Sequence, residues 1–221
     1  GGYSDHIIVP HSKYIVSYGD MDPAQAAPYA CSGLTAFSAL KKIPTTSKDD
    51  WIIIIGAGGV GINGILLSPA VHKAKILVID NDPEKRKKAL EAGANEAFAP
   101  DEETEIRNKI GIGSAAAIDF VGRPETTDLG LTLVKKGGMV IVVGLYGGSL
   151  KLSLPLVPMR SMSLRGSYVG ELRELKELVN IIKSGKIKLI PVKKQGLETA
   201  NQAMSDLRLG KVNGRIVLIP D

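Results

Sequence analysis

Residues 51–61 read Trp-Ile-Ile-Ile-Ile-Gly-Ala-Gly-Gly-Val-Gly, an unbroken apolar run followed by a glycine-rich turn. The run is rich in β-branched side chains, which predicts a buried strand, and an apolar helical pattern follows the turn. Gly56, Gly58 and Gly61 occupy the first, third and sixth positions of a G-x-G-x-x-G pattern in this strand-to-helix context. In such turns the first glycine permits the tight bend, the second lets a pyrophosphate approach the backbone, and the third lets the helix pack on the strand. The pattern predicts dinucleotide binding; a strand-to-helix turn without a ligand is the alternative.

A second strand is predicted over residues 75–79, and Asp80 follows it directly. Asp80 lies 24 residues after Gly56 and 19 after Gly61, where dinucleotide-binding units carry an acidic residue. A carboxylate there accepts hydrogen bonds from the adenosine ribose hydroxyls and repels a 2′-phosphate, which favours NAD over NADP. The alternative role for Asp80 is an N-cap for the helix predicted from Pro83, although Asp82 is better placed for it.

Strand and helix patterns alternate through the centre of the chain. The predicted strands cover residues 51–55, 75–79, 96–98, 116–121, 139–143 and 163–167. Near-continuous apolar strands separated by helices are typical of a parallel sheet covered on both faces. We therefore predict an α/β fold with a doubly wound parallel sheet. Outside this core we predict short strands at residues 6–10, 187–192 and 214–219.

The composition excludes several classes of protein. The 221 residues are 44% hydrophobic and 23% charged, as in ordinary globular proteins, and contain no apolar run of the roughly 18 residues that a membrane span needs. A single cysteine excludes an intrachain disulfide and favours a reducing, cytoplasmic location. The formal net charge is +5, but aromatic residues make up only 5% and the densest basic run, 85–88, is flanked by glutamates. We therefore expect neither a nucleic-acid nor a membrane partner.

Five segments carry a family resemblance. They are Cys31-Ser32-Gly33-Leu34-Thr35, the glycine turn, Val78-Ile79-Asp80, Asp119-Phe120-Val121-Gly122 and Val142-Val143-Gly144-Leu145. Together they resemble the zinc-dependent medium-chain alcohol dehydrogenases, over essentially the whole chain. The resemblance implies an NAD-binding Rossmann domain at 46–185. It assigns 1–45 to the end of a GroES-like, β-rich catalytic domain with a linking helix, and 186–221 to the return to that domain. The earlier catalytic domain is expected to lie before residue 1.

The resemblance also implies residue roles. Cys31 matches one of three protein ligands of a catalytic zinc, and Thr35 matches a residue beside the nicotinamide. The implied cofactor contacts are Gly59 and Val60 in the glycine turn, Lys85 at the ribose, Arg123 beside the adenine, Val143 and Leu145 beside the nicotinamide, the backbone of Ser167, Tyr168 and Val169 at its carboxamide, and Arg215 at the pyrophosphate. From the residues alone, a single cysteine in a helix, such as Cys31, is usually a buried core residue, and Lys85 and Arg123 could equally be surface charges.

The implied function is zinc-assisted, NAD-dependent hydride transfer between an alcohol and an aldehyde or ketone, in a homodimer or homotetramer. One alternative is a zinc-free relative of the quinone and enoyl reductases, against which Cys31 and Asp80 argue. The other is a truncated, catalytically inactive NAD-binding chain. A catalytic zinc needs three protein ligands, and the three histidines of the chain match no ligand position, so the chain is not expected to complete a zinc site alone.

Overall fold

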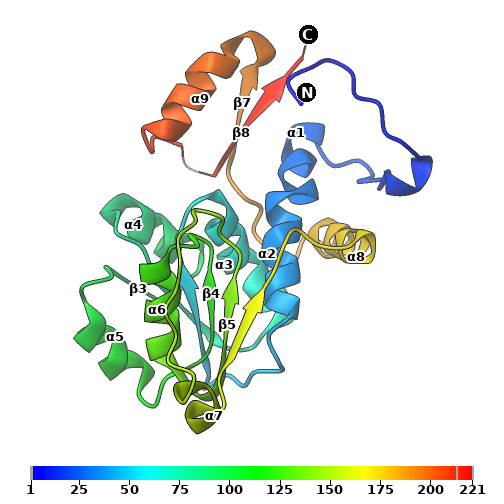
Figure 1. Ribbon diagram of the computed structural model, residues 1–221. Helices are drawn as coiled ribbons and strands as arrows, with labels where there is room; N and C mark the ends of the chain where they lie inside the picture. Colours follow the sequence, from blue (N-terminus) through cyan, green and yellow to red (C-terminus); the bar gives the residue numbers. More distant parts are fainter. Residues whose placement is uncertain (1, 213, 221) are drawn as a thin grey trace.

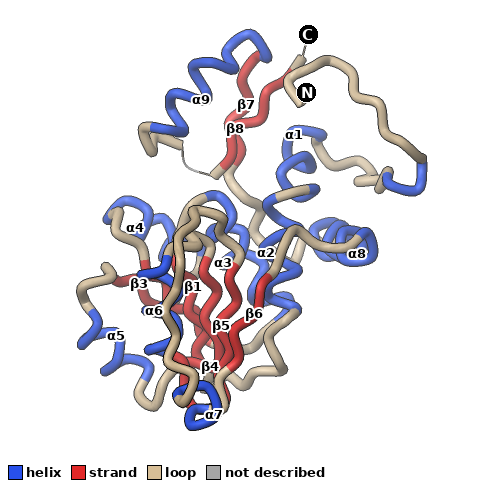
Figure 2. Tube along the Cα trace, viewed as in Figure 1, coloured by secondary structure: helices blue, strands red, loops and turns tan. Residues whose placement is uncertain are grey.

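The computed structural model describes residues 2–212 and 214–220, and its central layer is a six-stranded parallel sheet (Figures 1 and 2). The strands are β1 (Trp51–Ile55), β2 (Lys75–Ile79), β3 (Glu96–Phe98), β4 (Ser114–Asp119), β5 (Val134–Val142) and β6 (Ser163–Gly166). Their order is β3-β2-β1-β4-β5-β6, and every neighbouring pair is parallel. The predicted doubly wound α/β fold is confirmed.

The register of β1 determines which loops meet at the carboxyl edge of the sheet. Ile55, the last residue of β1, pairs with Ile79 of β2 on one side and with Asp119 of β4 on the other. The turns that follow these three strands therefore begin side by side. From β1 the chain continues outward to β2 and later returns to β4 on the opposite side, which creates the crevice where open α/β sheets bind ligands.

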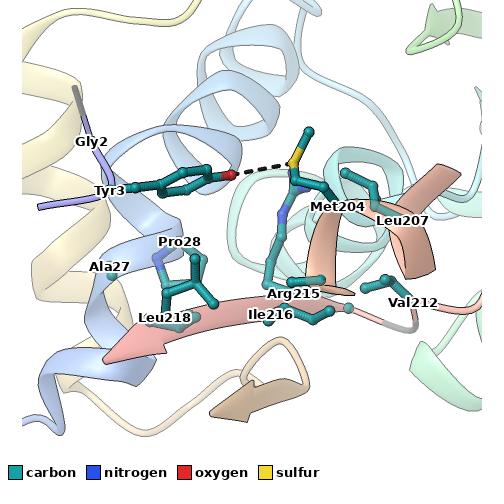
Figure 3. A pocket seen from close by; sticks show the side chains of 13 residues that line it. Gly2, Tyr3, Ala27, Pro28, Met204, Leu207, Val212, Arg215, Ile216 and Leu218 are labelled. Carbon is teal, nitrogen blue, oxygen red and sulfur yellow. Dashed lines mark hydrogen bonds between the residues drawn. The ribbon is translucent and has the colours of Figure 1, made fainter. Parts of the chain in front are cut away.

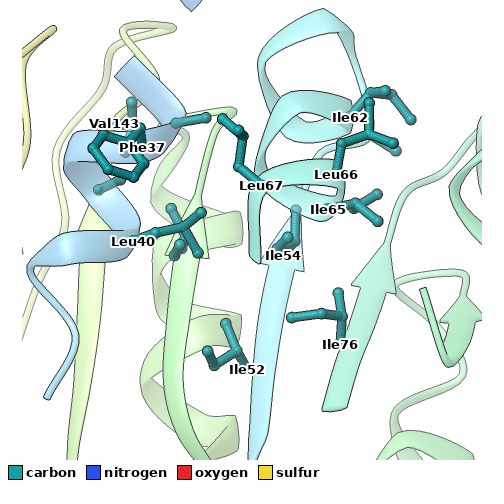
Figure 4. Close-up of a cluster of buried hydrophobic side chains, with 14 of the residues drawn as sticks. Phe37, Leu40, Ile52, Ile54, Ile62, Ile65, Leu66, Leu67, Ile76 and Val143 are labelled. Carbon is teal, nitrogen blue, oxygen red and sulfur yellow. The ribbon is translucent and has the colours of Figure 1, made fainter. Parts of the chain in front are cut away.

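Helices cover both faces of the sheet. The described residues form the helices α1 (Pro23–Ala26), α2 (Ser32–Lys41), α3 (Gly59–Val71), α4 (Pro83–Ala92), α5 (Glu103–Ile110), α6 (Pro124–Leu133), α7 (Leu156–Arg160), α8 (Leu172–Lys183) and α9 (Ala200–Arg208), with short 3₁₀ segments at Ser12–Tyr14, Ala27–Ala30 and Leu197–Thr199. Alternate residues of β1 enter opposite cores: Ile54 packs with α2 and α3 (Figure 4), and Ile53 packs with α5 and α6. Burial on both faces explains why β1 is apolar at every position.

The last part of the chain forms a separate two-stranded parallel sheet, β7 (Val192–Gly196) and β8 (Arg215–Ile219), beside α9 (Figure 1). Two hydrogen bonds tie the approach to β7 to the segment before α2. The Gln25 side-chain amide donates to the Ile190 carbonyl (2.9 Å), and the Ile190 amide donates to the Tyr29 hydroxyl (3.1 Å). Residues far apart in the sequence thus meet above the six-stranded sheet.

Two predicted strands differ in the structure. Residues 6–10 form no strand, and Ile7 and Ile8 are 76% and 95% exposed. A strand needs a neighbour for its backbone groups, and the described residues offer none there. The strand predicted at 187–192 begins only at Val192, because Pro191 has no amide hydrogen to donate to a ladder. Within the described residues, every helix is too short or too polar to cross a bilayer.

Candidate functional site

A cavity of about 680 Å³, the cleft, opens at the carboxyl edge of β1, β2 and β4. Its lining comes from the glycine turn and α3 (Gly56, Gly58, Gly59, Val60, Gly61), from the ends of the strands (Ile55, Ile79, Asp80, Phe120, Val121), from the following loops and helices (Asn81, Lys85, Pro100, Arg123, Glu125, Thr126, Leu129, Tyr146) and from Arg215 of β8. Segments more than 150 residues apart in the sequence therefore share one cavity.

The glycine turn is shaped by two close approaches. Gly56 has a φ of +92°, a backbone conformation that side chains disfavour, and a β-carbon there would lie 2.7 Å from the Val121 side chain. A β-carbon at Gly61 would lie 1.9 Å from the Gly56 carbonyl oxygen. Helix α3 can therefore start directly on the turn only because position 61 has no side chain. This is the packing that the sequence pattern predicts for the sixth position.

Gly58, at the start of α3, faces open space. Gly58 is the N-cap and provides no side-chain hydrogen bond, and a β-carbon added to it would meet no atom within 4 Å. The first backbone N–H groups of a helix lack intrahelical acceptors and carry the positive end of the helix dipole. The first turn of α3 therefore offers an anion-binding surface on the wall of the cleft.

Asp80 is only 7% exposed, and its carboxylate is held by the backbone on both sides. One oxygen accepts a hydrogen bond from the Ala57 amide (2.7 Å) in the glycine turn, and the other accepts from the Asp82 amide (2.9 Å). Each carboxylate oxygen has a further lone pair, and Asp80 lines the cleft, so it can still accept from a ligand. Asp82, not Asp80, caps α4: its side chain accepts from the Glu84 and Lys85 amides.

The outer walls of the cleft carry two cations. The Lys85 ammonium lies 4.0 Å from the Asp82 carboxylate, and the Arg123 guanidinium carbon lies 3.6 Å from the centroid of the Tyr146 ring. A guanidinium stacked on an aromatic face forms a flat surface suited to contact with a planar base. Sequence reasoning singled out Lys85 and Arg123 but missed Tyr146, whose pairing with Arg123 spans 23 residues that give no local signal.

Asp119 ends β4 and is fully buried. It receives four hydrogen bonds: from the Val121 and Gly122 amides (both 2.9 Å) and from the Thr126 and Thr127 hydroxyls (2.8 and 2.7 Å). This carboxylate fixes the turn that carries Val121 and joins it to the start of α6. Sequence reasoning gave Asp119 no role, although an acidic residue at the end of a buried strand was a visible signal.

Arg215 extends from β8 to the glycine turn. Its Nε donates to the Ser32 hydroxyl (3.2 Å), and a β-carbon at Gly59 would lie 2.6 Å from its guanidinium carbon. Burial lowers the pKa of Arg215, and the nearby Cys31 sulfur acts in the opposite direction. Its usual pKa is so high that the group remains a cation at neutral pH. The structure therefore brings Arg215 to the N-terminal end of α3.

Arg215 also borders a second cavity, of about 320 Å³, between α9, β8 and the start of the chain (Figure 3). There the Tyr3 hydroxyl donates a hydrogen bond to the Met204 sulfur (3.3 Å). The described lining of this cavity is otherwise mostly apolar. The cleft is therefore a better candidate site for a polar ligand than this second cavity.

The residues assigned to the nicotinamide side by resemblance do not line the cleft, except for Val60. Thr35 donates its hydroxyl proton to the Cys31 carbonyl (2.8 Å). Val143 and Val169 pack on the core, and Val169 has a φ of +48°. Leu145 lies in a neighbouring hollow of about 350 Å³ that shares Arg123 with the cleft. Tyr168 is exposed, while the Ser167 hydroxyl is buried without a hydrogen-bond partner among the described residues.

Cys31 is exposed and stands at the N-cap of α2. A catalytic zinc site takes three protein ligands and keeps one open position. In the part of the chain that the structure describes, no three His, Cys, Asp or Glu side chains come together to hold a metal. These residues do not fit a complete zinc site, and Cys31 is available as a single ligand.

Known proteins resemble this chain along nearly its whole length. An NAD-dependent alcohol dehydrogenase of Sulfolobus acidocaldarius is 36% identical over 99% of this chain and 64% of its own length. A D-arabinose 1-dehydrogenase (NADP(+)) of Saccharolobus solfataricus is 34% identical over 100% of this chain and 64% of its own length. The chain thus spans less than two thirds of these curated relatives.

A solved structure and a family model also match this chain. The crystal structure of the alcohol dehydrogenase from Aeropyrum pernix matches with a TM-score of 0.84 and 33% identity, over 91% of this chain and 60% of that chain. The family model described as zinc-binding dehydrogenase matches residues 59–184, more than half of the chain. From α3 to α8 this match covers the first turn of α3, Asp80, Asp119 and Arg123. The chain therefore belongs to the zinc-binding dehydrogenase family.

Proposed function

We propose that this chain is the cofactor-binding part of an NAD-dependent oxidoreductase that interconverts alcohols with aldehydes or ketones. The observation that carries the proposal is the Asp80 carboxylate, buried at the end of β2 with free acceptor positions on the cleft beside the glycine turn. The relatives support an alcohol as substrate, but their names include both NAD and NADP(+) enzymes. The choice of cofactor therefore rests on Asp80.

The glycine turn and Asp80 would bind the dinucleotide from two sides. The first turn of α3 and Arg215 would hold the diphosphate, and Asp80 would accept hydrogen bonds from the adenosine ribose. A 2′-phosphate would bring a second negative charge against the Asp80 carboxylate, so NAD is favoured over NADP. Lys85 would contact the ribose, and the Arg123–Tyr146 pair would flank the adenine.

The bound nicotinamide would supply the hydride acceptor. We propose that Thr35 and Val60 orient its ring, that Val143 and Leu145 border it, and that the backbone of Ser167, Tyr168 and Val169 binds its carboxamide. Cys31 would be one ligand of a catalytic zinc. Its companion ligands would come from outside the described residues, because the described part of the chain does not assemble them.

We further propose the division into 1–45, 46–185 and 186–221 as catalytic-domain end, NAD-binding domain and C-terminal return. A homodimer or homotetramer is proposed because β6 is an exposed edge strand that pairs only with β5 in the described sheet. Light scattering on the full protein measures this state. A cytoplasmic location is proposed because the one thiol, Cys31, is exposed and unpaired.

The test combines binding and turnover on the full protein. NADH and NADPH are titrated by nucleotide fluorescence, and oxidation of primary and secondary alcohols is followed with each cofactor, with and without added zinc. NADH is expected to bind at least about tenfold more tightly, equivalent to about 1.4 kcal/mol, and alcohols to be oxidised with NAD.

Three results would overturn the proposal. Tighter binding of NADPH would remove the role of Asp80 in cofactor choice. Reduction of conjugated C=C bonds without alcohol oxidation would identify a zinc-free reductase instead. Nucleotide binding without turnover of any alcohol or carbonyl compound would leave a binding protein that is not an enzyme.

A further inference from the structure

Ser32, the first residue of α2, has a hydroxyl group whose hydrogen-bonding positions are all occupied by protein. It donates to the Pro28 carbonyl (2.9 Å), and it accepts from the Asn63 side-chain amide (3.1 Å) and from Arg215 Nε (3.2 Å). A hydroxyl offers one donor and two acceptor positions, so none remains. Ser32 is only 4% exposed, which keeps water from replacing these partners.

Asn63 links Ser32 to the glycine turn. It is fully buried in α3, and its amide nitrogen donates both to Ser32 and to the Gly59 carbonyl (3.1 Å). Two acceptors facing the same nitrogen fix the orientation of the amide group. The Ser32 hydroxyl is therefore held at a set position relative to the first turn of α3.

Arg215 is half-buried and has no carboxylate partner in the described part of the chain. Its Nε bond to Ser32 leaves the terminal nitrogens to face the cleft beside Gly59. A partly buried cation without an anion is destabilising, because burial removes part of its hydration. This unpaired charge, next to the first turn of α3 and the open face of Gly58, marks the point where an anionic ligand would neutralise it.

We infer that Ser32, supported by Asn63, is a positioning residue that fixes the Arg215 guanidinium over the first turn of α3 for the diphosphate of the cofactor. The inference rests on the proposed dinucleotide function and adds a residue from the segment after Cys31 to the diphosphate site. Ser32 acts through Arg215 and does not itself contact the ligand.

The experiment compares two ligands that differ in the diphosphate. ADP-ribose and adenosine are titrated calorimetrically into the full protein and into Ser32→Ala, Arg215→Lys and the double variant. Losing the Ser32 bond is expected to weaken ADP-ribose binding about fivefold, with adenosine binding unchanged. Arg215→Lys keeps the charge but loses the Nε donor, so adding Ser32→Ala to it is expected to change ADP-ribose binding by less than about twofold.

Ser68→Ala is the matched control, because Ser68 is a buried serine of α3 whose hydroxyl has no partner among the described residues. It is expected to leave both affinities unchanged. Asn63→Ala loosens Ser32 without altering it and is expected to give the same loss confined to ADP-ribose. This variant keeps the inference testable if Ser32→Ala does not fold.

Equal weakening of adenosine and ADP-ribose would show that Ser32 only supports the fold, and additive effects of Ser32→Ala and Arg215→Lys would show that it does not act through Arg215. Either result would overturn the inference while leaving the proposed function in place. Failure of the unaltered protein to bind ADP-ribose, NADH or NADPH would overturn both.

Discussion

Asp80 and Asp119 lie on opposite sides of the end of β1: Asp119 pairs with Ile55, and Asp80 directly follows Ile79, which pairs with Ile55 on the other side. Both are buried, yet their carboxylates have different partners. Asp119 receives four hydrogen bonds from its own turn and from α6 and is absent from the lining of the cleft. Asp80 receives two and lines the cleft.

A carboxylate has about four acceptor positions, so the partners already present decide what else it can bind. Asp119 has none left and stabilises a turn. Asp80 has two left, and it lines the cleft together with the glycine turn. Burial and charge are alike at the two positions, so neither property by itself shows which carboxylate can still bind a ligand. The number of acceptor positions already occupied does.

The strongest destabilisation is expected at Asp119. Asp119→Ala leaves two backbone amides and two hydroxyls without their acceptor in the interior, and is expected to lower the free energy of unfolding by about 4 kcal/mol. Chemical denaturation of the full protein measures it, with exposed Asp128→Ala of α6 as control. A stable Asp119→Ala protein that has lost only NADH binding would show that Asp119 is a ligand-binding residue, and would contradict the distinction drawn between Asp119 and Asp80.

The next strongest effect is expected in the glycine turn, whose Ala57 amide donates a hydrogen bond to Asp80. Gly61→Ala puts a β-carbon 1.9 Å from the Gly56 carbonyl and is expected to cost about 3 kcal/mol of folding free energy. Gly58→Ala meets no atom and has an ordinary φ of −69°, so it is expected to fold normally and to weaken NADH binding by obstructing the cleft. Thermal unfolding and NADH titration separate the two. Equal stability of both variants would contradict the close packing at Gly61.

Cofactor preference tests Asp80 itself. Asp80→Ser removes the negative charge from the cleft and also shortens the acceptor for the Ala57 amide. NADH affinity is expected to fall about tenfold and NADPH affinity to rise relative to it, because the repulsion of a 2′-phosphate is removed. Fluorescence titration with both nucleotides gives the ratio. An unchanged ratio of NADH to NADPH affinity would contradict the assignment of Asp80 to the ribose.

The smallest effect is expected at Asp82, two residues beyond Asp80. Asp82→Ala removes the cap of α4 and is expected to cost about 1 kcal/mol of stability. The preference for NADH over NADPH should stay as in the unaltered protein. A shift in that preference would mean that the whole turn after β2, rather than the Asp80 carboxylate, discriminates between the cofactors.

Much of the central sheet could be predicted from the sequence. The strands at 51–55, 75–79 and 96–98 have the predicted limits, because buried parallel strands are continuously apolar and end at polar or glycine residues. Strand β4 begins two residues earlier than predicted, and β5 five residues earlier. Helix α7 was not predicted, because five residues that follow Pro155 and include Pro158 give no helical period.

Prediction failed where structure depends on a distant neighbour. Residues 6–10 have the composition of a strand, but no described strand pairs with them. The same limit applies to the site. Asp80 could be predicted as a site residue because one β-α-β unit fixes its distance from the glycines. The roles of Ser32, Asn63 and Tyr146 could not be predicted, since each role depends on a partner that local spacing does not reveal.

Local sequence patterns account for the glycine turn, the acidic residue after β2 and the alternating strands and helices, because these follow from backbone sterics and hydrophobic periodicity over at most about thirty residues. The folded chain was needed to show that Arg215, near the end of the chain, donates a hydrogen bond to Ser32 beside that turn, and that Asp119 is fully satisfied while Asp80 is not. Hydrogen-bond satisfaction depends on which groups the fold brings within 3 Å or so of each other, and no local pattern encodes that distance.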